Sequence, residues 1–526
     1  MKTGGPSKKA GRLAVVFSPL LLASLALPCG ATDWPQYRGP THNGVSTDRL
    51  VKQWTGALTN PVWRVSLTNA LSSLTVSGGR VFTQTRRAIG GVSREICVAL
   101  DAATGGELWA VPVDNAFYPE TGVGFDDGPR STPVVDGGSV FVLSSYLKLY
   151  RLNATNGAIQ WERDLRLLYG GTVIGWQNAA SPLIEDGLIF LNANPEISCL
   201  MALRTSDGEL QWRSQDEYMT HATPVLATIY GMRQVIFAAQ SGLVSLEPTS
   251  GELLWKAPYP FNYGTSVAVS PVVHKDMVFI SGAQEYNMGS VAFRVSVSNN
   301  TWTAAQLWSN VGFASTLASV WMTPVCHDGF LYGQFGVQSF SSVNAQLKCV
   351  ELRTGTVKWS VNGFGRGATL LVDGHLLVLT EKGDLVLATV NTNAYAEVAR
   401  CLAIPFWNTG TNKCWNSPAV CDGRVYVRST SAVACYDFSL PALKLDAPQR
   451  LSPGQFQLSV RMANGAPVSS NRFAGVEILA GTSLAQPLGE WTKLTNQLVL
   501  TNGVIRIDRV DSSAQPQRYF IVSEPE

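Results

Sequence analysis

A unit that ends in Gly-x-x-x-Trp recurs along the chain and restricts the fold more than any other feature of the sequence. Five copies keep both residues: Gly105/Trp109, Gly157/Trp161, Gly208/Trp212, Gly251/Trp255 and Gly355/Trp359. Trp308 is a sixth copy without the glycine, and Val398 occupies the tryptophan position of a degenerate seventh. Successive tryptophans from Trp109 to Trp359 are 43 to 53 residues apart. This period matches a four-stranded propeller blade and predicts one four-stranded sheet per unit.

A second marker lies upstream of the tryptophan in each unit. It consists of Ser-Pro or Thr-Pro and two apolar runs around a turn, as in Thr132-Pro133 before VVDGGSVFVL. The same marker occurs at Ser181, Thr223, Ser270, Thr323 and Ser417, and the pattern recurs without proline near Ser73 and Ala368. Apolar runs around Asp-Gly or Gly-Gly predict β-hairpins. Their continuous hydrophobicity predicts that both faces of each hairpin are covered.

The sequence contains eight hairpin markers but only seven copies of the fourth strand. The last unit, residues 416–440, ends after three strands, whereas residues 60–67 (NPVWRVSL) precede the first unit and carry Trp63. We expect the Trp63 segment to complete the last sheet, because closure of the ring removes both open sheet edges. The predicted fold is all-β: an eight-bladed β-propeller closed by an N-terminal strand and followed by a small C-terminal β-sandwich-like domain.

The first 31 residues have the composition of a secretory signal peptide. Four basic side chains precede an apolar run of 15 residues, Leu13–Leu27, and a Gly-Ala pair before Thr32 offers a cleavage site. We therefore expect residues 1–31 to direct export to the periplasm or the cell exterior. A lipid anchor at Cys29 is the alternative, although Pro28 directly before it argues against that modification.

Three further segments follow the predicted signal peptide. Residues 32–60 are expected to form an N-terminal extension, residues 61–445 the propeller, and residues 450–526 a small C-terminal β domain. The repeat is absent from this last segment, and Asn502-Gly503 between apolar runs indicates a hairpin there. No segment after the signal peptide reaches membrane-spanning length without polar breaks.

The repeats resemble a known superfamily when they are taken together with the N-terminal sequence DWPQYRGP at residues 33–40. The TGxxxW units and the hairpins of the form SPVVxDGxVY are similar to those of the pyrroloquinoline-quinone-repeat (PQQ-like, quinoprotein alcohol dehydrogenase-like) β-propellers. The resemblance covers roughly residues 33–440 and implies the propeller fold. It leaves the function open, because the superfamily includes quinoprotein dehydrogenases and non-enzymatic propellers alike.

Residues directly before each first strand gather at one end of the central channel in a propeller. At these positions the chain carries a binding-site candidate made of Arg130, Trp176, Asn178, His221, Trp321, Arg366 and Trp415. Asp126, Asp127, Gln177, Tyr263 and Asn416 occupy similar positions. Aromatic side chains and arginines are typical binding anchors, and a mouth with convergent polar groups is a typical site. The structural alternative is polar cover for the channel, with tryptophans packed against neighbouring blades.

The sequence favours a non-enzymatic, exported propeller that binds a protein or an extended ligand and needs no cofactor. Its formal net charge of +2 provides no basic field for nucleic acid, and G-x-S-x-G, Walker A and H-E-x-x-H motifs are absent. The alternative is a dehydrogenase of alcohols or sugars that uses PQQ and Ca²⁺. Trp321 or Trp415 would then stack on the quinone, while Asp126 and Asn178 would serve the ion or act as base. A carbohydrate-binding module is a third possibility.

Eight cysteines remain when the signal peptide is set aside. Cys401 and Cys414 flank a polar loop, and an oxidising compartment predicts a disulfide between them. The other six are expected to be mostly buried thiols, four of them at similar positions of the repeat.

Overall fold

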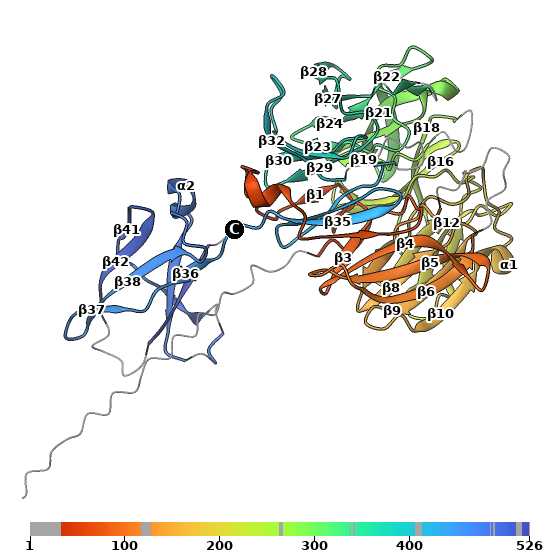
Figure 1. Cartoon of the computed structure of the whole chain (residues 1–526). Helices are drawn as coiled ribbons and strands as arrows, with labels where there is room; N and C mark the ends of the chain where they lie inside the picture. The colour runs from red at the N-terminus through yellow and green to blue at the C-terminus, as the bar shows by residue number, and fades with distance from the viewer. Residues whose placement is uncertain are drawn as a thin grey trace, which may run out of the picture. The chain divides into compact units, whose positions relative to one another are not determined.

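The computed structural model describes residues 33–116, 128–261, 267–336, 338–339, 342–343, 345–404, 413–483, 485–487, 490–511 and 518–524. The chain divides into two compact units, of which one is Ala31–Leu440 and the other contains Pro441–Glu526. Strands dominate both units (Figure 1). No helix in the described part of the chain is long and apolar enough to cross a membrane.

In the first unit, the described strands form eight sheets whose first to fourth strands follow one another in the chain, except in the last sheet. The first four sheets contain β3 (Thr75–Ser77), β4 (Arg80–Ile89), β5 (Val92–Asp101) and β6 (Glu107–Asn115); β7 (Val134–Asp136), β8 (Ser139–Leu143), β9 (Lys148–Asn153) and β10 (Ile159–Asp164); β11 (Leu183–Glu185), β12 (Leu188–Asn192), β13 (Leu200–Arg204) and β14 (Leu210–Ser214); β15 (Val225–Ile229), β16 (Met232–Ala239), β17 (Gly242–Leu246) and β18 (Leu253–Pro258).

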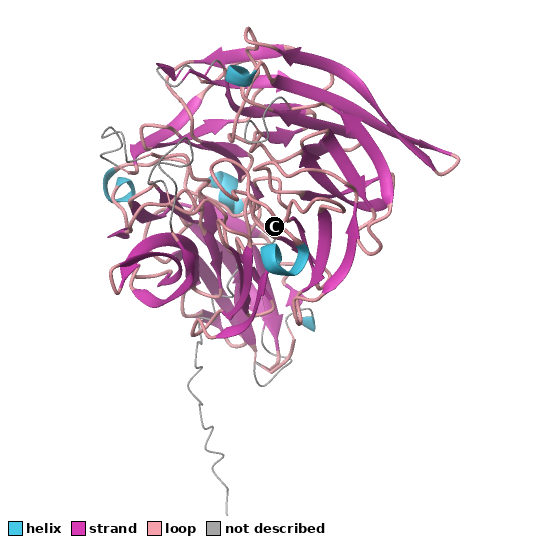
Figure 2. Ribbon diagram, turned by 90° about the vertical axis from the view of Figure 1, so that its right-hand side faces the viewer, coloured by secondary structure: helices cyan, strands magenta, loops and turns pink. Residues whose placement is uncertain are grey.

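The other four sheets contain β19 (Val272–His274), β20 (Met277–Ser281), β21 (Gly289–Ser298) and β22 (Thr301–Val311); β23 (Val325–His327), β24 (Phe330–Phe335), β27 (Gln346–Glu351) and β28 (Val357–Val361); β29 (Ala368–Val372), β30 (His375–Leu379), β31 (Asp384–Thr389) and β32 (Glu397–Leu402), joined by β1 (Val45–Ser46); β33 (Ala419–Cys421), β34 (Arg424–Arg428), β35 (Ala432–Asp437) and β2 (Trp63–Ser66). Among the described residues the unit also contains a short hairpin of β25 (Gln338–Ser339) and β26 (Ser342–Val343), the helix α1 (Leu165–Tyr169) and the 3₁₀ turns η1 (Gly56–Thr59) and η3 (Gln284–Tyr286). Figure 2 shows that strands far outnumber the few short helical turns.

The Gly-x-x-x-Trp motif joins neighbouring sheets. Gly157 has φ of +73°, and a Cβ atom there would lie 2.8 Å from the indole of Trp109 in the preceding sheet. The same contact recurs between Gly105 and Trp63, Gly208 and Trp161, Gly251 and Trp212, and Gly355 and Trp308. In addition, Trp109 Nε1 donates a hydrogen bond to the Ala154 carbonyl at 3.2 Å. The motif therefore needs glycine for both its backbone conformation and the close approach of the tryptophan.

The Ser/Thr-Pro marker joins the same neighbours through backbone hydrogen bonds. The N–H of one marker residue donates to the hydroxyl of the next: Ser73 to Thr132 at 3.0 Å, Thr132 to Ser181 at 2.9 Å, Ser181 to Thr223 at 3.0 Å, Ser270 to Thr323 at 3.1 Å and Ser417 to Ser73 at 2.9 Å. A buried N–H needs such a partner, which explains why the repeat keeps a hydroxyl at this position.

The N-terminal strand β2 completes the last sheet, as the strand count predicts. Trp63 pairs with Cys435 on β35, and its Nε1 donates to the Ala102 carbonyl in the first sheet at 3.0 Å. The bond from Ser417 to Ser73 also links the last sheet to the first. The predicted position of Trp63 beside residues 417–438 is therefore confirmed.

The N-terminal extension contacts several sheets on its way to β2. Trp34 forms a β-bridge with Val76 next to the first hairpin turn, and the Pro35 carbonyl accepts a hydrogen bond from Val135 in the second sheet at 2.7 Å. β1 pairs in parallel with β29 of the seventh sheet. The extension is thus an integral part of the first unit.

The second unit contains two sheets and a short helix around its own core. One sheet contains β36 (Leu443–Leu445), β38 (Gln455–Met462), β42 (Val504–Asp511), β41 (Leu498–Thr501) and β37 (Gln449–Ser452); the other contains β40 (Thr492–Lys493), β39 (Glu477–Gly481) and β43 (Tyr519–Ser523), and the helix is α2 (Ser470–Phe473). Its hydrophobic cluster, which includes Leu458 and Ile507, draws only on residues after Leu440. β36 pairs with β38, so residues 443–445 join this unit and not the predicted propeller segment.

Removal of the second unit is expected to leave the first one folded, because each unit has its own hydrophobic core. A chain ending at Leu440 should keep the melting temperature of the first unit within about 1 °C, the shift produced by roughly 1 kcal/mol in a unit of this size. Differential scanning calorimetry of the mature protein would measure it. The matched control is Leu458→Asp in the full chain, which should unfold only the second unit. Insoluble truncated protein would contradict this organisation.

Cys401 and Cys414 do not form the predicted disulfide: both are buried, free thiols. They lie in the apolar core shared by the seventh and last sheets, and burial raises the pKa of each thiol to about 12. A protonated thiol in an apolar core reacts slowly, since the thiolate is the reactive form. Of the other six cysteines outside the signal peptide, five are buried and Cys326 is partly exposed.

Candidate functional site

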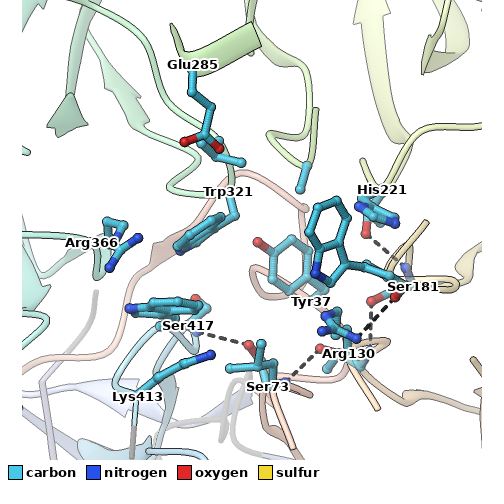
Figure 3. A pocket seen from close by; sticks show the side chains of 18 of the residues that line it. Tyr37, Ser73, Arg130, Ser181, His221, Glu285, Trp321, Arg366, Lys413 and Ser417 are labelled. Carbon is cyan, nitrogen blue, oxygen red and sulfur yellow. Dashed lines mark hydrogen bonds between the residues drawn. The ribbon is translucent and has the colours of Figure 1, made fainter. Parts of the chain in front are cut away.

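One cavity of about 370 Å³ lies where the segments between successive sheets converge. Six of the seven predicted residues line it: Arg130, Trp176, His221, Trp321, Arg366 and Trp415 (Figure 3). Each comes from a different segment between two sheets. The repeat therefore brings these six residues together, although they are spread over nearly 300 residues of sequence.

Two tryptophans and two cations form a compact cluster on one side of the cavity. The rings of Trp321 and Trp415 lie 4.5 Å apart between centroids, with an interplanar angle of 37°. The Arg366 guanidinium lies 4.6 Å from the Trp415 ring and 5.5 Å from the Trp321 ring, and Lys413 Nζ lies 4.6 Å from the Trp415 ring. These distances allow cation–π attraction, which fixes the two indoles before any ligand arrives.

Glu381 holds Arg366 and Trp415 in place through hydrogen bonds. Its Oε1 accepts hydrogen bonds from Arg366 Nε at 3.0 Å and from Trp415 Nε1 at 3.2 Å, and its Oε2 accepts from the Arg366 backbone N–H at 3.1 Å. Both side chains of the Arg366–Glu381 ion pair are largely buried. A charged pair with additional hydrogen bonds holds its geometry more firmly than an exposed pair.

Arg130, Trp176 and His221 form the opposite side through backbone carbonyls. Arg130 Nη1 donates to the Trp176 carbonyl at 3.1 Å, and His221 Nε2 lies 2.8 Å from the Gln177 carbonyl. Trp176 and Gln177 have φ of +59° and +57°. Successive left-handed, non-glycine residues are strained, and such strain persists where the surroundings impose it. The arginine and the histidine supply that restraint here.

Burial sets the protonation of two groups that line the cavity. The pKa of His221 is lowered to about 4, first by burial and then by the charge of Arg130, while the carbonyls of Gln177 and Gly175 act in the opposite direction. His221 is therefore neutral near pH 7, and its Nε2 is the protonated nitrogen, because a carbonyl can only accept. Burial also raises the pKa of Glu285, against the attraction of Arg366.

The structure corrects the prediction for Asn178, which does not line the cavity. Its side chain is only 1% exposed. It closes a local turn, with Oδ1 accepting from the Ala180 N–H at 3.1 Å and Nδ2 donating to the Ala180 carbonyl at 3.0 Å. Asn416 is likewise buried, and its Nδ2 donates to the Ser72 carbonyl at 2.9 Å. The predicted positions Asp126, Asp127 and Tyr263 lie outside the described residues.

Sequence reasoning missed several residues that line the cavity, among them Tyr37, Glu285 and Lys413. Lys413 lies two residues before Trp415 in the same segment, so its position alone was a usable signal. Tyr37 belongs to the N-terminal extension and Glu285 to η3, which follows a second strand. Neither residue lies directly before a first strand, which is where the repeat predicts the residues that line the channel mouth.

Exposed apolar side chains lie on the segments that also carry the cavity tryptophans. Phe313 is 68% exposed between β22 and β23, the segment that contains Trp321. Leu167 is 84% exposed on α1, the helix in the segment that contains Trp176, and its neighbour Leu168 is also exposed. Single exposed apolar side chains are common on protein surfaces, so Phe313 and Leu167 mark accessible positions on these segments.

Comparison with known proteins connects the chain to one family. The family model described as outer membrane protein assembly factor BamB matches residues 92–361. Two curated relatives carry the same description: one from Yersinia pestis, 26% identical over 46% of this chain and 61% of the relative, and one from Moranella endobia (strain PCIT), 22% identical over 60% and 63%. The chain thus spans about three fifths of the length of these relatives.

A solved structure supports the fold alone. The quinohemoprotein alcohol dehydrogenase from Comamonas testosteroni is 12% identical, with a TM-score of 0.52 over 80% of this chain and 82% of that one. The likeness agrees with an all-β, propeller-like architecture. Because the family model covers 270 residues (92–361) of the 526 in the chain, this protein belongs to the BamB family of the PQQ-repeat β-propeller superfamily.

Proposed function

We propose that this protein is an exported, non-enzymatic binding module whose cavity and surrounding rim hold a protein or another extended ligand. The observation that carries the proposal is the convergence of six side chains from six segments in one cavity. Large, rigid aromatic side chains and arginines provide binding energy at low entropic cost. The exposed Phe313 and Leu167 lie on segments that also carry cavity tryptophans, so they offer positions from which a bound partner can be probed.

The family supports the same proposal. The two curated relatives are described as outer membrane protein assembly factors, a description that fits a scaffold which binds other proteins. We propose, accordingly, that residues 1–31 direct the chain to the periplasm, that the eight sheets are eight blades closed by β2, and that the second unit is a separable β-sandwich-like domain. No resident cofactor is needed for this role.

A PQQ-dependent dehydrogenase is less well supported by the geometry. A quinone stacked on Trp415 needs an open indole face, whereas the Trp415 ring already contacts Trp321, Arg366 and Lys413. A centroid distance of 4.5 Å leaves no space for a third ring between the two indoles. Asn178, one of the two groups predicted to serve the ion or act as base, closes a turn with its side chain.

The proposal is tested by photo-crosslinking from the rim in the producing cell. With p-benzoylphenylalanine in place of Phe313 we expect a discrete protein adduct. With the same probe at Leu108, which is 48% exposed on the edge strand β6, we expect none. Trp321→Ala or Trp415→Ala in the Phe313-probe protein should reduce the adduct strongly, since loss of a central tryptophan anchor weakens binding by about 2 kcal/mol, roughly 30-fold.

Two results would contradict the proposal. One is an adduct from Phe313 that is unchanged in both tryptophan variants although the protein remains folded. The other is saturable, dye-linked oxidation of an alcohol or sugar by the purified protein supplied with PQQ and Ca²⁺, which would establish the dehydrogenase instead.

A further inference from the structure

Arg38 of the N-terminal extension is a buried cation that binds only backbone carbonyls. Arg38 is only 3% exposed. Nη1 donates to the Thr323 carbonyl at 2.8 Å, and Nη2 donates to the carbonyls of Pro324 at 2.8 Å and Asn43 at 2.9 Å. None of the ion pairs within the described residues includes Arg38. A buried charge without a carboxylate is costly, so these carbonyl contacts require an explanation.

The chain is shaped to receive this guanidinium. Gly44 has φ of +77°, and a Cβ atom there would lie 2.8 Å from Arg38 Nη2. Arg38 itself has φ of +64°. A glycine and a left-handed arginine in one short turn build a socket for a single side chain. This turn gives Arg38 a fixed position relative to the carbonyls of Thr323 and Pro324.

Those carbonyls end the segment that presents Trp321 to the cavity. The Thr323 N–H donates to the Trp321 carbonyl at 2.9 Å, and the Val320 carbonyl accepts from Ala268 at 2.8 Å. Further upstream, Lys348 Nζ donates to the Thr316 carbonyl at 2.7 Å. Lys348 thus holds the segment on the upstream side of Trp321, and Arg38 holds it on the downstream side.

The residue next to Arg38 reaches the same cavity. Tyr37 lines it, and Figure 3 shows Tyr37 near the middle of the group formed by Trp321, Arg130 and His221. The N-terminal extension therefore touches the site twice, once with the Tyr37 ring and once through the backbone that carries Trp321. Neither contact follows from a role in closing the last sheet, which β2 alone performs.

We propose that Arg38 is a positioning residue of the binding site: through the carbonyls of Thr323 and Pro324 it fixes the segment that presents Trp321, so that the N-terminal extension forms one wall of the cavity. The role of the cavity rests on the proposed function. The position of Trp321 does not, because it can be measured without a ligand.

The test is ¹⁹F NMR of the mature full chain labelled with 5-fluorotryptophan. Trp321→Phe and Trp415→Phe assign the resonances of two of the three cavity tryptophans, and Trp109→Phe and Trp212→Phe assign two tryptophans of fourth strands. In Arg38→Met we expect the Trp321 and Trp415 resonances to shift and broaden, while those of Trp109 and Trp212 stay in place. Arg38→Lys, which keeps the charge but not the fork of donors, should give a smaller change.

Arg428→Met is the matched control, because Arg428 is also fully buried and bonded mainly to backbone carbonyls, but at the junction of the last and first sheets. It should leave the Trp321 resonance unchanged; the Trp415 resonance is not used in this comparison, because Lys413, which contacts the Trp415 ring, is hydrogen-bonded to Thr430 near Arg428. If Arg38→Met does not fold, Arg38→Lys decides by the same criterion. Unchanged cavity resonances in a folded Arg38 variant, or an equal shift of the Trp321 resonance in Arg428→Met, would overturn the proposal. A shift in the Arg38 variant, together with a Phe313 adduct that is unchanged in the Trp321→Ala and Trp415→Ala variants, would refute the proposed function alone.

Discussion

Replacing Trp63 with alanine is expected to lower the free energy of unfolding of the first unit by about 3–5 kcal/mol, the range for large-to-small changes at buried aromatic residues. The indole lies between the last sheet and the first, against Gly105. Its removal leaves a cavity at the junction that closes the ring, and the Ala102 carbonyl keeps only the longer hydrogen bond from the Tyr426 hydroxyl at 3.4 Å. Urea unfolding of the chain that ends at Leu440, followed by far-UV circular dichroism, would measure the change.

A pair of glycine substitutions separates ring closure from local backbone strain. Gly79 and Gly105 have φ of +72° and +74°, but a Cβ atom would meet nothing within 4 Å at Gly79 and the Trp63 ring at 2.6 Å at Gly105. Gly79→Ala is therefore expected to cost about 1–2 kcal/mol for the left-handed backbone alone, and Gly105→Ala clearly more. The double variant of Trp63→Ala and Gly105→Ala should cost less than the sum of the two, because the clash is gone. Equal costs for the two glycine variants would place Trp63 elsewhere.

The sequence was sufficient to predict the repeat, the strand order and the position of Trp63, because these depend on motifs that recur. A Gly-x-x-x-Trp unit and a hairpin marker each have one structural solution in a ring of sheets, so counting them predicts β2 in the last sheet. The role of the Ser/Thr hydroxyl, which accepts a hydrogen bond from the neighbouring sheet, was not predictable in this way. Its partner is a backbone N–H some 42 to 59 residues away in most links, and only the close approach of neighbouring sheets shows it.

The candidate site was predictable to the level of the segment but not of the side chain. Position before a first strand was enough to select Trp321 and Arg366, whereas Asn178 occupies the same kind of position and turns inward to close a turn. Glu381, which fixes Arg366, follows a second strand and has no motif. Tyr37 and Arg38 come from the N-terminal extension, whose path is set by contacts with individual sheets and not by the repeat.

The disulfide prediction failed for a related reason. Cys401 and Cys414 are separated by a short loop in the sequence, but each thiol is packed into the apolar core between the seventh and last sheets. Sequence proximity indicates only that two cysteines can meet. In the folded protein, burial raises the pKa of both thiols to about 12, which keeps them protonated and slows any later oxidation.

Lowering the pH from 8 to 5 is expected to reduce the free energy of unfolding of the first unit by about 4 kcal/mol through two histidines, about 2 kcal/mol each. Burial lowers the pKa of His42 and of His221 from 6.5 to about 4. Above pH 6.5 both are neutral in the folded and the unfolded chain, so they cause no change there. Between pH 6.5 and 4 the unfolded chain takes up protons that the folded chain refuses, and stability is lost as the pH falls.

Urea unfolding at intervals between pH 8 and 5 measures this loss. The window matters, because the carboxyl groups with lowered pKa values, such as Asp101 and Glu397, stay ionised throughout it. His42→Gln and His221→Gln should each reduce the loss by about 2 kcal/mol. A smaller dependence remains in the double variant, because the pKa of His274 is also lowered and those of Glu285 and Asp422 are raised. Gln at position 221 can still donate to the Gln177 carbonyl, so the left-handed turn at Trp176 retains its restraint while the titration disappears. A slope that is undiminished in the double variant would mean that the buried histidines are not its source.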